Sequence, residues 1–103
     1  MNFPKFFICP ISKNITDSVV DFCYKNNASI GLIPSRRQVE WNGGYANNWT
    51  TESFAQYTTG LLLKRDHGGP GQGCKDDDGY KSLEYDCKYL NFIHVDPWKT
   101  YSS

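Results

Sequence analysis

The pair Asp66-His67 is the sharpest chemical feature of this 103-residue chain. It directly follows an apolar segment, 61–65, whose composition predicts a β-strand. A neutral imidazole ligates divalent metals, and an adjacent carboxylate can orient a ligand or transfer a proton. Such a pair also makes ordinary loop hydrogen bonds, so a catalytic and a structural interpretation both stay open.

A second pair, His94 and Asp96, lies at the end of the apolar segment 92–95. Because side chains alternate along a strand, His94 and Asp96 are expected on one face and Val95 on the other. Ligand sites in parallel α/β folds lie at the carboxyl ends of the strands. The two His–Asp pairs are therefore expected at one rim, with a purely structural hydrogen bond between His94 and Asp96 as the alternative.

Basic and polar side chains follow the apolar segment 28–33. Arg36 and Arg37 could clamp a phosphate or carboxylate in bidentate fashion, and Gln38 completes a polar set with them. Alternation predicts that the two arginines point in different directions, so at most one of them should reach the rim. An ordinary surface pair is the alternative.

The segment 68–73 is rich in glycine and must form a loop. Its glycines, among them Gly69 and Gly71, would let backbone N–H groups approach a phosphate. The segment matches neither the G-x-x-x-x-G-K-[ST] nor the G-x-G-x-x-G pattern, and a flexible turn explains it equally well.

Strand-like and helix-like segments alternate and would position these residues. Strands are predicted at 6–9, 28–33, 61–65 and 92–95, and helices over 14–25 and from an N-cap at Thr50 to before Gly60. A third helix has its predicted apolar face at Tyr80, Leu83, Cys87 and Leu90. The acidic run 76–78 suits its start, with a metal-binding cluster as the alternative. The order βαβαβαβ predicts an α/β domain with a parallel sheet and right-handed crossovers.

Composition excludes several classes of protein. Lys+Arg 11 balances Asp+Glu 11, which argues against nucleic-acid binding. No apolar run approaches the ~20 residues of a membrane span. The four cysteines form no C-x-x-C pair and are expected to be buried free thiols. Without a recognisable signal peptide, a cytoplasmic location is expected.

With these residues in view, the sequence resembles the amino-terminal half of the accessory (non-catalytic) subunit family of class II D-tagatose-1,6-bisphosphate aldolase. The landmarks occur in the right order with similar gaps and cover most of residues 6–96. They are Gln38-Val39, Gly43-Gly44-Tyr45, Thr50, Phe54, Asp66-His67-x-Gly69-Pro70 and Ile93-His94-Val95-Asp96.

The resemblance implies the first half of a TIM barrel and a role in sugar-phosphate aldol chemistry. Accessory subunits of this family support a zinc-dependent aldolase subunit. In related class II aldolases the matching pair supplies a proton-transferring carboxylate, here Asp66, and a zinc-binding histidine, here His67. The other zinc histidines of that class lie beyond this sequence. The segment Ile33-Pro34-Ser35-Arg36-Arg37 departs from the family, which carries an acidic residue and small side chains there.

Three functional hypotheses follow. The first is a divergent tagatose-bisphosphate-aldolase-like protein of sugar-phosphate metabolism, either an accessory subunit or a zinc-dependent lyase. In the second case, these 103 residues alone are not expected to be active. The second is a non-enzymatic half-barrel that needs a partner chain, either an aldolase catalytic subunit or another copy. The third is a carbohydrate-binding domain that uses the aromatic side chains Trp41, Tyr45, Trp49 and Trp98.

The chain length supports a partial barrel. A complete barrel takes roughly 250 residues, whereas 103 residues fit four strands and three helices. Residues 1–103 are therefore expected to form a single half-barrel domain, truncated just past its fourth strand, with two open sheet edges.

Overall fold

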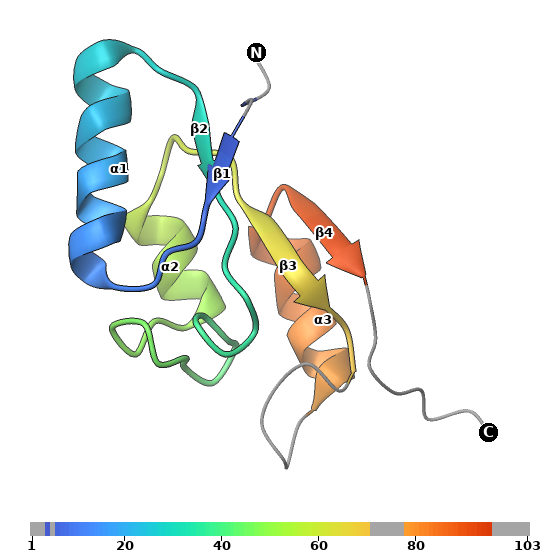
Figure 1. The fold of residues 1–103 in the computed structure, drawn as a ribbon. Helices are drawn as coiled ribbons and strands as arrows, with labels where there is room; N and C mark the ends of the chain where they lie inside the picture. The colour runs from blue at the N-terminus through green and yellow to red at the C-terminus, as the bar shows by residue number, and fades with distance from the viewer. Residues whose placement is uncertain (1–3, 5, 71–77, 96–103) are drawn as a thin grey trace.

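Strands and helices alternate along the whole described chain (Figure 1). The structure is a computed structural model that describes residues 4, 6–70 and 78–95. Its elements are β1 (Phe6–Ile8), α1 (Lys13–Asn26), β2 (Ile30–Leu32), α2 (Thr51–Tyr57), β3 (Lys64–Gly68), α3 (Gly79–Tyr89) and β4 (Phe92–Val95). The predicted α/β class and its βαβαβαβ order are confirmed.

The strands are parallel and follow one another in sequence order. β1 pairs with β2, and β3 pairs with β4, both in parallel. Two isolated parallel bridges, Leu32 with Leu63 and Ser35 with Asp66, connect β2 to β3. A doubly wound sheet reverses its strand order at a switch point, whereas a barrel keeps sequence order. The two two-stranded sheets, β1-β2 and β3-β4, joined by these bridges keep sequence order and are consistent with half of an α/β fold.

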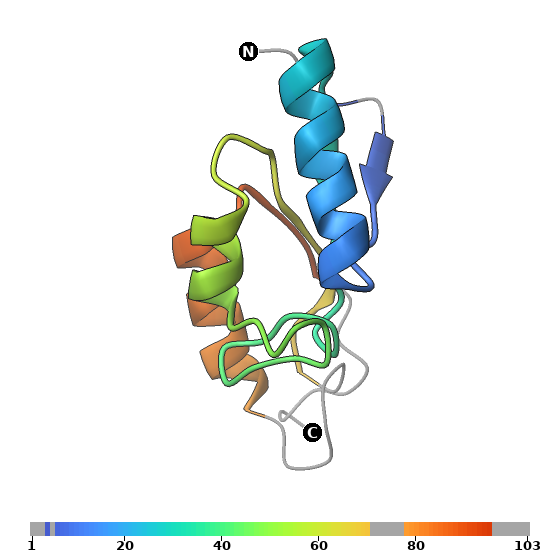
Figure 2. The ribbon, with the colours of Figure 1, turned by 90° about the vertical axis from the view of Figure 1, so that its left-hand side faces the viewer.

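The helices share one side of the strands. The core joins Val19 and Cys23 of α1 and Phe54 of α2 to Leu32 and Leu63. Figures 1 and 2 show α2 and α3 behind the strands, with α1 beside β1 and β2. The opposite face of β3 and β4 carries no described helix.

The helix boundaries follow from local capping. The Ser12 hydroxyl accepts a hydrogen bond from the Ile15 amide at the start of α1, and Asn27 ends that helix in the left-handed region. Thr50 and Ser53 form a capping box on α2, which confirms the predicted N-cap. Asp78 caps α3 by accepting from the Lys81 amide, while Asp76 and Asp77 lie outside the described residues.

The third strand begins later than predicted. The prediction was 61–65, but β3 spans Lys64–Gly68, preceded by the single bridge at Leu63. Leu63 lies in the core and Leu61 packs against it, whereas the residues of the strand that pair with β4 include the polar Lys64 and Arg65. Hydrophobicity marks what is buried rather than where a ladder starts, which explains the error. Asp66 and His67 consequently lie inside the strand.

The predicted inner face of α3 is only partly correct. Tyr80 is 59% exposed and Cys87 is also exposed, while the buried residues of the helix are Gly79, Ser82 and Asp86. Of the predicted face, Leu90 is buried at the C-cap and Leu83 is half-buried. The helix turns a carboxylate inward because β3 presents a buried arginine to it, as described below.

The cysteine prediction is confirmed only in part. Among the described residues Cys9, Cys23 and Cys87 are free thiols, but only Cys23 is buried. Cys74 lies outside the described residues. Across the described part of the chain, no helix is long and apolar enough to span a membrane.

Candidate functional site

Strand alternation assigns a set of side chains to the face of the sheet that no described helix covers. Arg65 points toward the helices, where it contacts α3, so its neighbours Lys64 and Asp66 point the other way. In the parallel register Lys64 pairs with Phe92 and Arg65 with Ile93, which places Phe92 and His94 on that same side. We call this set, Phe7, Lys64, Asp66, Phe92 and His94, the helix-free face.

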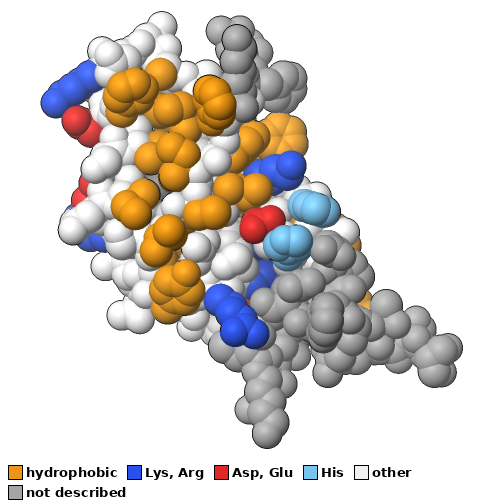
Figure 3. Space-filling model, viewed as in Figure 1, with side chains coloured by type: hydrophobic (Ala, Val, Ile, Leu, Met, Phe, Trp, Pro, Cys, Tyr) orange, Lys and Arg blue, Asp and Glu red, His pale blue; other side chains and the backbone are white. Residues whose placement is uncertain are grey.

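Three chemically competent side chains converge where β3 and β4 end. His67 Nε2 lies 3.5 Å from Asp66 Oδ1, an ion pair that is charged only when the imidazole is protonated. The rings of His67 and His94 lie 5.5 Å apart between centroids. Figure 3 shows the two histidines side by side with an acidic side chain next to them. The predicted convergence of Asp66, His67 and His94 at one rim is present in the structure.

A local irregularity produces this convergence. His67 adopts a left-handed backbone, φ 51°, and the register of β3 against β4 shifts between Arg65 and Gly68. In a regular strand the consecutive side chains of Asp66 and His67 would point to opposite faces. The β-bulge brings them together, as bulges do near binding sites.

The two arginines take different environments. Arg36 is 1% exposed. Its Nε donates to Glu40 Oε2 at 2.7 Å and its Nη1 donates to the Gly69 carbonyl at 2.6 Å. Arg37 is exposed. Arg36 is thus committed to holding two loops together, and of the two arginines it is Arg37 whose side chain is open to solvent.

The remaining predicted ligand residues serve structural contacts or lie outside the described residues. Gln38 is buried, and its Oε1 accepts from the Ser35 amide at 2.9 Å. Gly69 is buried with φ 96°, a conformation that favours glycine, and its carbonyl accepts from Arg36. Gly71 and Asp96 lie outside the described residues, so the proposed His94–Asp96 pair is not tested.

The aromatic side chains proposed for sugar stacking are mostly occupied. Trp49 is 5% exposed and packs against Phe54 and Tyr57 in the core. Trp41 lies 6.2 Å from the Tyr85 ring, with the Lys81 ammonium over it. Tyr45 is exposed, and Trp98 lies outside the described residues. Of the described aromatics proposed for stacking, Trp49 is therefore buried, Trp41 is half-buried and Tyr45 is exposed.

Sequence reasoning missed the role of Arg65, which is fully buried. Its Nε and Nη2 donate to the two oxygens of Asp86 at 2.9 and 2.8 Å, and its Nη1 donates to the Val39 and Ser35 carbonyls at 2.7 and 2.8 Å. This side chain ties the segment after β2 to α3. Arg65 lies two residues after Leu63, so strand alternation places both side chains on the inward face. This spacing could have identified Arg65 as buried.

Lys64 was also missed. It is half-buried, and its Nζ lies 5.8 Å from the centroid of the Phe7 ring. The Phe7 and Phe92 rings meet edge to face at 6.5 Å. Its spacing of two residues from Asp66 predicts a common face and could have identified it.

The residues in the described part of the chain do not fit a zinc centre. Structural and catalytic zinc sites use three or four protein ligands. Among the described residues, no group of three His, Cys, Asp or Glu side chains is arranged to hold a metal ion. Zinc thus stays a prediction that requires ligands besides Asp66, His67 and His94.

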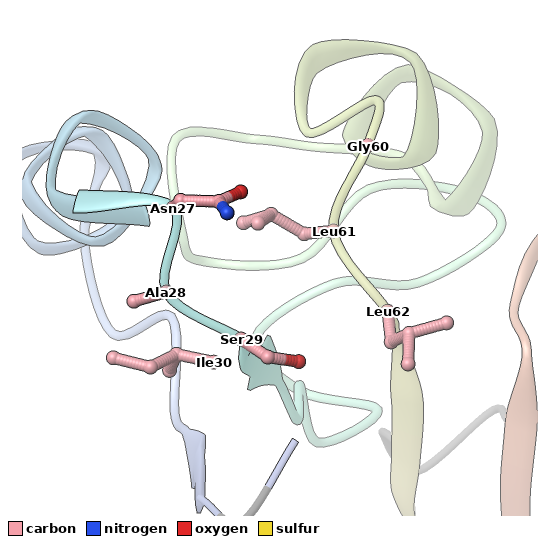
Figure 4. Close-up of a pocket in the computed structure, with 7 residues that line it drawn as sticks. All are labelled: Asn27, Ala28, Ser29, Ile30, Gly60, Leu61 and Leu62. Atoms are coloured by element: carbon pink, nitrogen blue, oxygen red, sulfur yellow. The ribbon is translucent and has the colours of Figure 1, made fainter. Parts of the chain in front are cut away.

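A cavity of about 260 Å³ lies at the other end of the sheet (Figure 4). Its lining residues precede β2 and β3 in the chain, apart from Ile30, which begins β2, so the cavity lies at the amino ends of the strands. Figure 4 shows the Asn27 and Leu61 side chains directed toward one another across it. Because ligand chemistry in parallel sheets belongs to the carboxyl ends, the rim at Asp66 is the better candidate site.

Comparisons with known proteins bear on the fold. No protein-family model matches the chain, and no curated protein matches it. Among solved structures, the chain is similar to the crystal structure of "a probable tagatose 6 phosphate kinase from Sinorhizobium meliloti 1021", with a TM-score of 0.62 and 19% sequence identity. The match covers 95% of this chain and 30% of that chain. At this identity the likeness supports the α/β fold alone, and the chain spans less than a third of that protein.

Proposed function

We propose that this chain binds a phosphorylated sugar on the helix-free face and serves sugar-phosphate metabolism as a divergent tagatose-bisphosphate-aldolase-like protein. The observation that carries the proposal is the cluster of Asp66, His67 and His94 at the carboxyl ends of two adjacent parallel strands. The similar solved structure is that of a probable tagatose 6 phosphate kinase, which supports a phosphorylated sugar as the ligand.

Each side chain of the cluster has a chemical task in this proposal. The imidazole N–H groups of His67 and His94 donate hydrogen bonds to phosphate or hydroxyl oxygens. The Asp66 carboxylate, beside His67, accepts a proton from the sugar and returns it. Exposed Arg37 pairs with a phosphate group. An accessory subunit and a catalytic one would use this same binding face.

A binding measurement tests the proposal. In NMR titrations, D-tagatose 1,6-bisphosphate should shift the His67 and His94 resonances, whereas unphosphorylated D-tagatose should bind at least tenfold more weakly. The double variant His67→Ala/His94→Ala should lose about 1.4 kcal/mol or more of binding, which is tenfold in affinity. Asp21→Asn, an exposed change on α1, serves as the matched control. Equal affinities for the double variant and the unmodified chain would reject the site.

A second candidate function is a half-barrel that pairs with a second copy of this chain. The specific observation is a line of exposed apolar side chains along α1 and the β1 edge. Phe6 is 68% exposed, and the line continues through Ile11, Ile15 and Phe22. Figure 3 shows hydrophobic side chains gathered over α1 and β1.

The topology favours a second copy as the partner. Within the described residues β1 pairs only with β2, and β4 pairs only with β3, so both edges are open. Open edges pair readily with other strands. The β4 edge of one copy could align in parallel with the β1 edge of another, and two copies would supply the eight strands of a closed barrel. An aldolase catalytic subunit is the competing partner.

A further inference from the structure

The backbone at His67 is the unusual feature of the candidate site. His67 has φ 51°, in the left-handed region that non-glycine residues rarely adopt, and it lies within the register shift between Arg65 and Gly68. Such a conformation persists only where neighbouring contacts hold it in place. The imidazole of His67 therefore stays beside His94 only if the chain on both sides of His67 is fixed.

The strands fix the chain directly before and after His67. The Asp66 amide donates to the Pro34 carbonyl at 3.0 Å. A Cβ atom added at Gly68 would lie 3.3 Å from the His94 carbonyl oxygen, so β4 packs closely against this residue. Because β3 ends at Gly68, its ladder with β4 does not hold the chain beyond that point.

Arg36 holds the chain immediately after β3. Its Nη1 donates to the Gly69 carbonyl at 2.6 Å, across 33 residues of sequence. A guanidinium is always protonated, and hydrogen bonds from a charged donor are about twice as strong as neutral ones. Arg36 is buried, so water does not compete for the bond. The residue two positions after His67 is thus fixed by a side chain from another loop.

A carboxylate that α3 orients holds Arg36 in turn. The Arg36 Nε donates to Glu40 Oε2 at 2.7 Å, and Glu40 Oε1 accepts from the Ser82 hydroxyl at 2.6 Å. Because the guanidinium is planar and rigid, the contact at Nε also sets the direction in which Nη1 points. A continuous set of hydrogen bonds therefore runs from Ser82 of α3 through Glu40 and Arg36 to Gly69.

We propose that Arg36 is a positioning residue of the candidate site, which places the His67 imidazole beside His94 by holding Gly69. This inference rests on the proposed sugar-phosphate role. A ligand that contacts both imidazoles needs them at a fixed separation, which is 5.5 Å between ring centroids. Without the Arg36 contact, the bulge is expected to relax toward a regular strand, in which His67 and Asp66 point to opposite faces.

Two variants break this contact from its two ends. Arg36→Met/Glu40→Gln removes the donor together with its buried counter-charge, and the replacement of a whole buried ion pair is often tolerated. Gly69→Ala displaces the acceptor, because alanine disfavours φ 96°. Gly60→Ala is the matched control. Gly60 has φ 99° on the turn between α2 and β3, with open space for a methyl group, so it carries the same backbone penalty away from the rim.

The nuclear Overhauser effect between the His67 and His94 rings measures the placement in the ligand-free chain. This effect should be lost in both variants and retained in Gly60→Ala. Gly69→Ala added to the double variant should cause little further change, because the same contact is already gone. Circular dichroism confirms folding, and if the double variant does not fold, Gly69→Ala against Gly60→Ala decides alone. A ring contact retained in a folded variant, or lost equally in Gly60→Ala, overturns the inference.

Titration with D-tagatose 1,6-bisphosphate separates this inference from the sugar-phosphate role. The affinity should fall at least tenfold in both variants and stay unchanged in Gly60→Ala. If the unmodified chain does not bind the bisphosphate, the proposed function fails, while a lost ring contact still supports the link from Arg36 to His67. If the unmodified chain binds and the variants bind equally well, sugar binding stands and the positioning role is wrong.

Discussion

Two buried arginines organise the loops at the rim. Arg65 makes a bidentate ion pair with Asp86, and Arg36 pairs with Glu40, whose other oxygen accepts from Ser82 at 2.6 Å. A buried guanidinium keeps its charge, so it must find a full set of acceptors. These contacts fix the segment after β2 against β3 and α3, and thereby shape the floor beneath the candidate site.

Removing the carboxylate from this buried pair should destabilise the fold strongly. Asp86→Ala leaves the buried Arg65 charge uncompensated, and we expect a loss of about 3–5 kcal/mol in the free energy of unfolding, measured in urea. Asp21→Ala removes an exposed pair with Lys25 and should cost about 0–1 kcal/mol. A loss below about 1 kcal/mol for Asp86→Ala would contradict the assigned role.

The exposed pair of Lys13 and Asp17 gives a pH prediction. Two hydrogen bonds lower the pKa of Asp17 below its usual 3.8. The larger effect comes from Lys13 and the smaller from Tyr57. The folded pKa therefore lies below the unfolded one. The resulting stabilisation is present above the unfolded pKa and is lost as the pH falls through the folded pKa.

Lys13→Met should raise the pKa of Asp17 toward its ordinary value, because the largest cause of the lowering disappears. A carboxyl-carbon NMR titration measures this change directly. Asp21 on the same helix provides the internal reference, since its partner Lys25 is unchanged. An Asp17 pKa that does not move would show that Lys13 is not the cause.

At the scale of the elements, the close approach of the Phe7 ring explains why position 31 of β2 is a glycine. The backbone conformation does not require it. A Cβ atom added at this position of β2 would lie 2.4 Å from Cε2 of Phe7, which is too close for two carbons. The glycine therefore lets the Phe7 ring lie flat across the helix-free face, where it meets Phe92 and Lys64. One small residue in β2 thus shapes the helix-free face.

Gly31→Ala should push the Phe7 ring out of place and cost about 1–3 kcal/mol in the free energy of unfolding. NMR contacts between the Phe7 and Phe92 rings should weaken at the same time. The double variant Gly31→Ala/Phe7→Leu should recover part of the loss, because the clashing ring is gone. Strictly additive costs in the double variant would show that the two residues do not interact.

The whole molecule leaves two sheet edges and an apolar line on α1 without a partner in the described structure. Ile15 and Phe22 lie one above the other on the side of α1 away from Tyr24, since seven residues make about two helical turns. Tyr24 is 90% exposed, and together with Tyr57 it lines a different part of the surface.

Ile15→Glu should therefore weaken self-association, whereas Tyr24→Glu should leave it unchanged. Light scattering after size-exclusion chromatography, repeated over a range of protein concentrations, reports the oligomeric state. We expect the unmodified chain to associate as the concentration rises. A monomer with one cooperative thermal transition at high temperature would reject the paired half-barrel.

The sequence by itself determined the features that depend on nearby residues. The βαβαβαβ order and the N-cap at Thr50 follow from hydrophobic pattern and local hydrogen bonding, and the element order places Asp66, His67 and His94 at the carboxyl ends of two strands. Hydrogen bonds to helix N-caps span only three residues, so the chain encodes them locally.

Only the tertiary structure decided where charges are buried and which faces are left open. Arg65 finds Asp86 21 residues away, and Arg36 finds the Gly69 carbonyl 33 residues away. Sequence patterns do not reveal such distant partners. For this reason the sequence did not predict that α3 turns a polar face inward or that β3 begins at Lys64. The bulge at His67 likewise depends on the ladder with β4. A charge can be buried at acceptable cost only when a partner lies next to it, and the tertiary fold places that partner there.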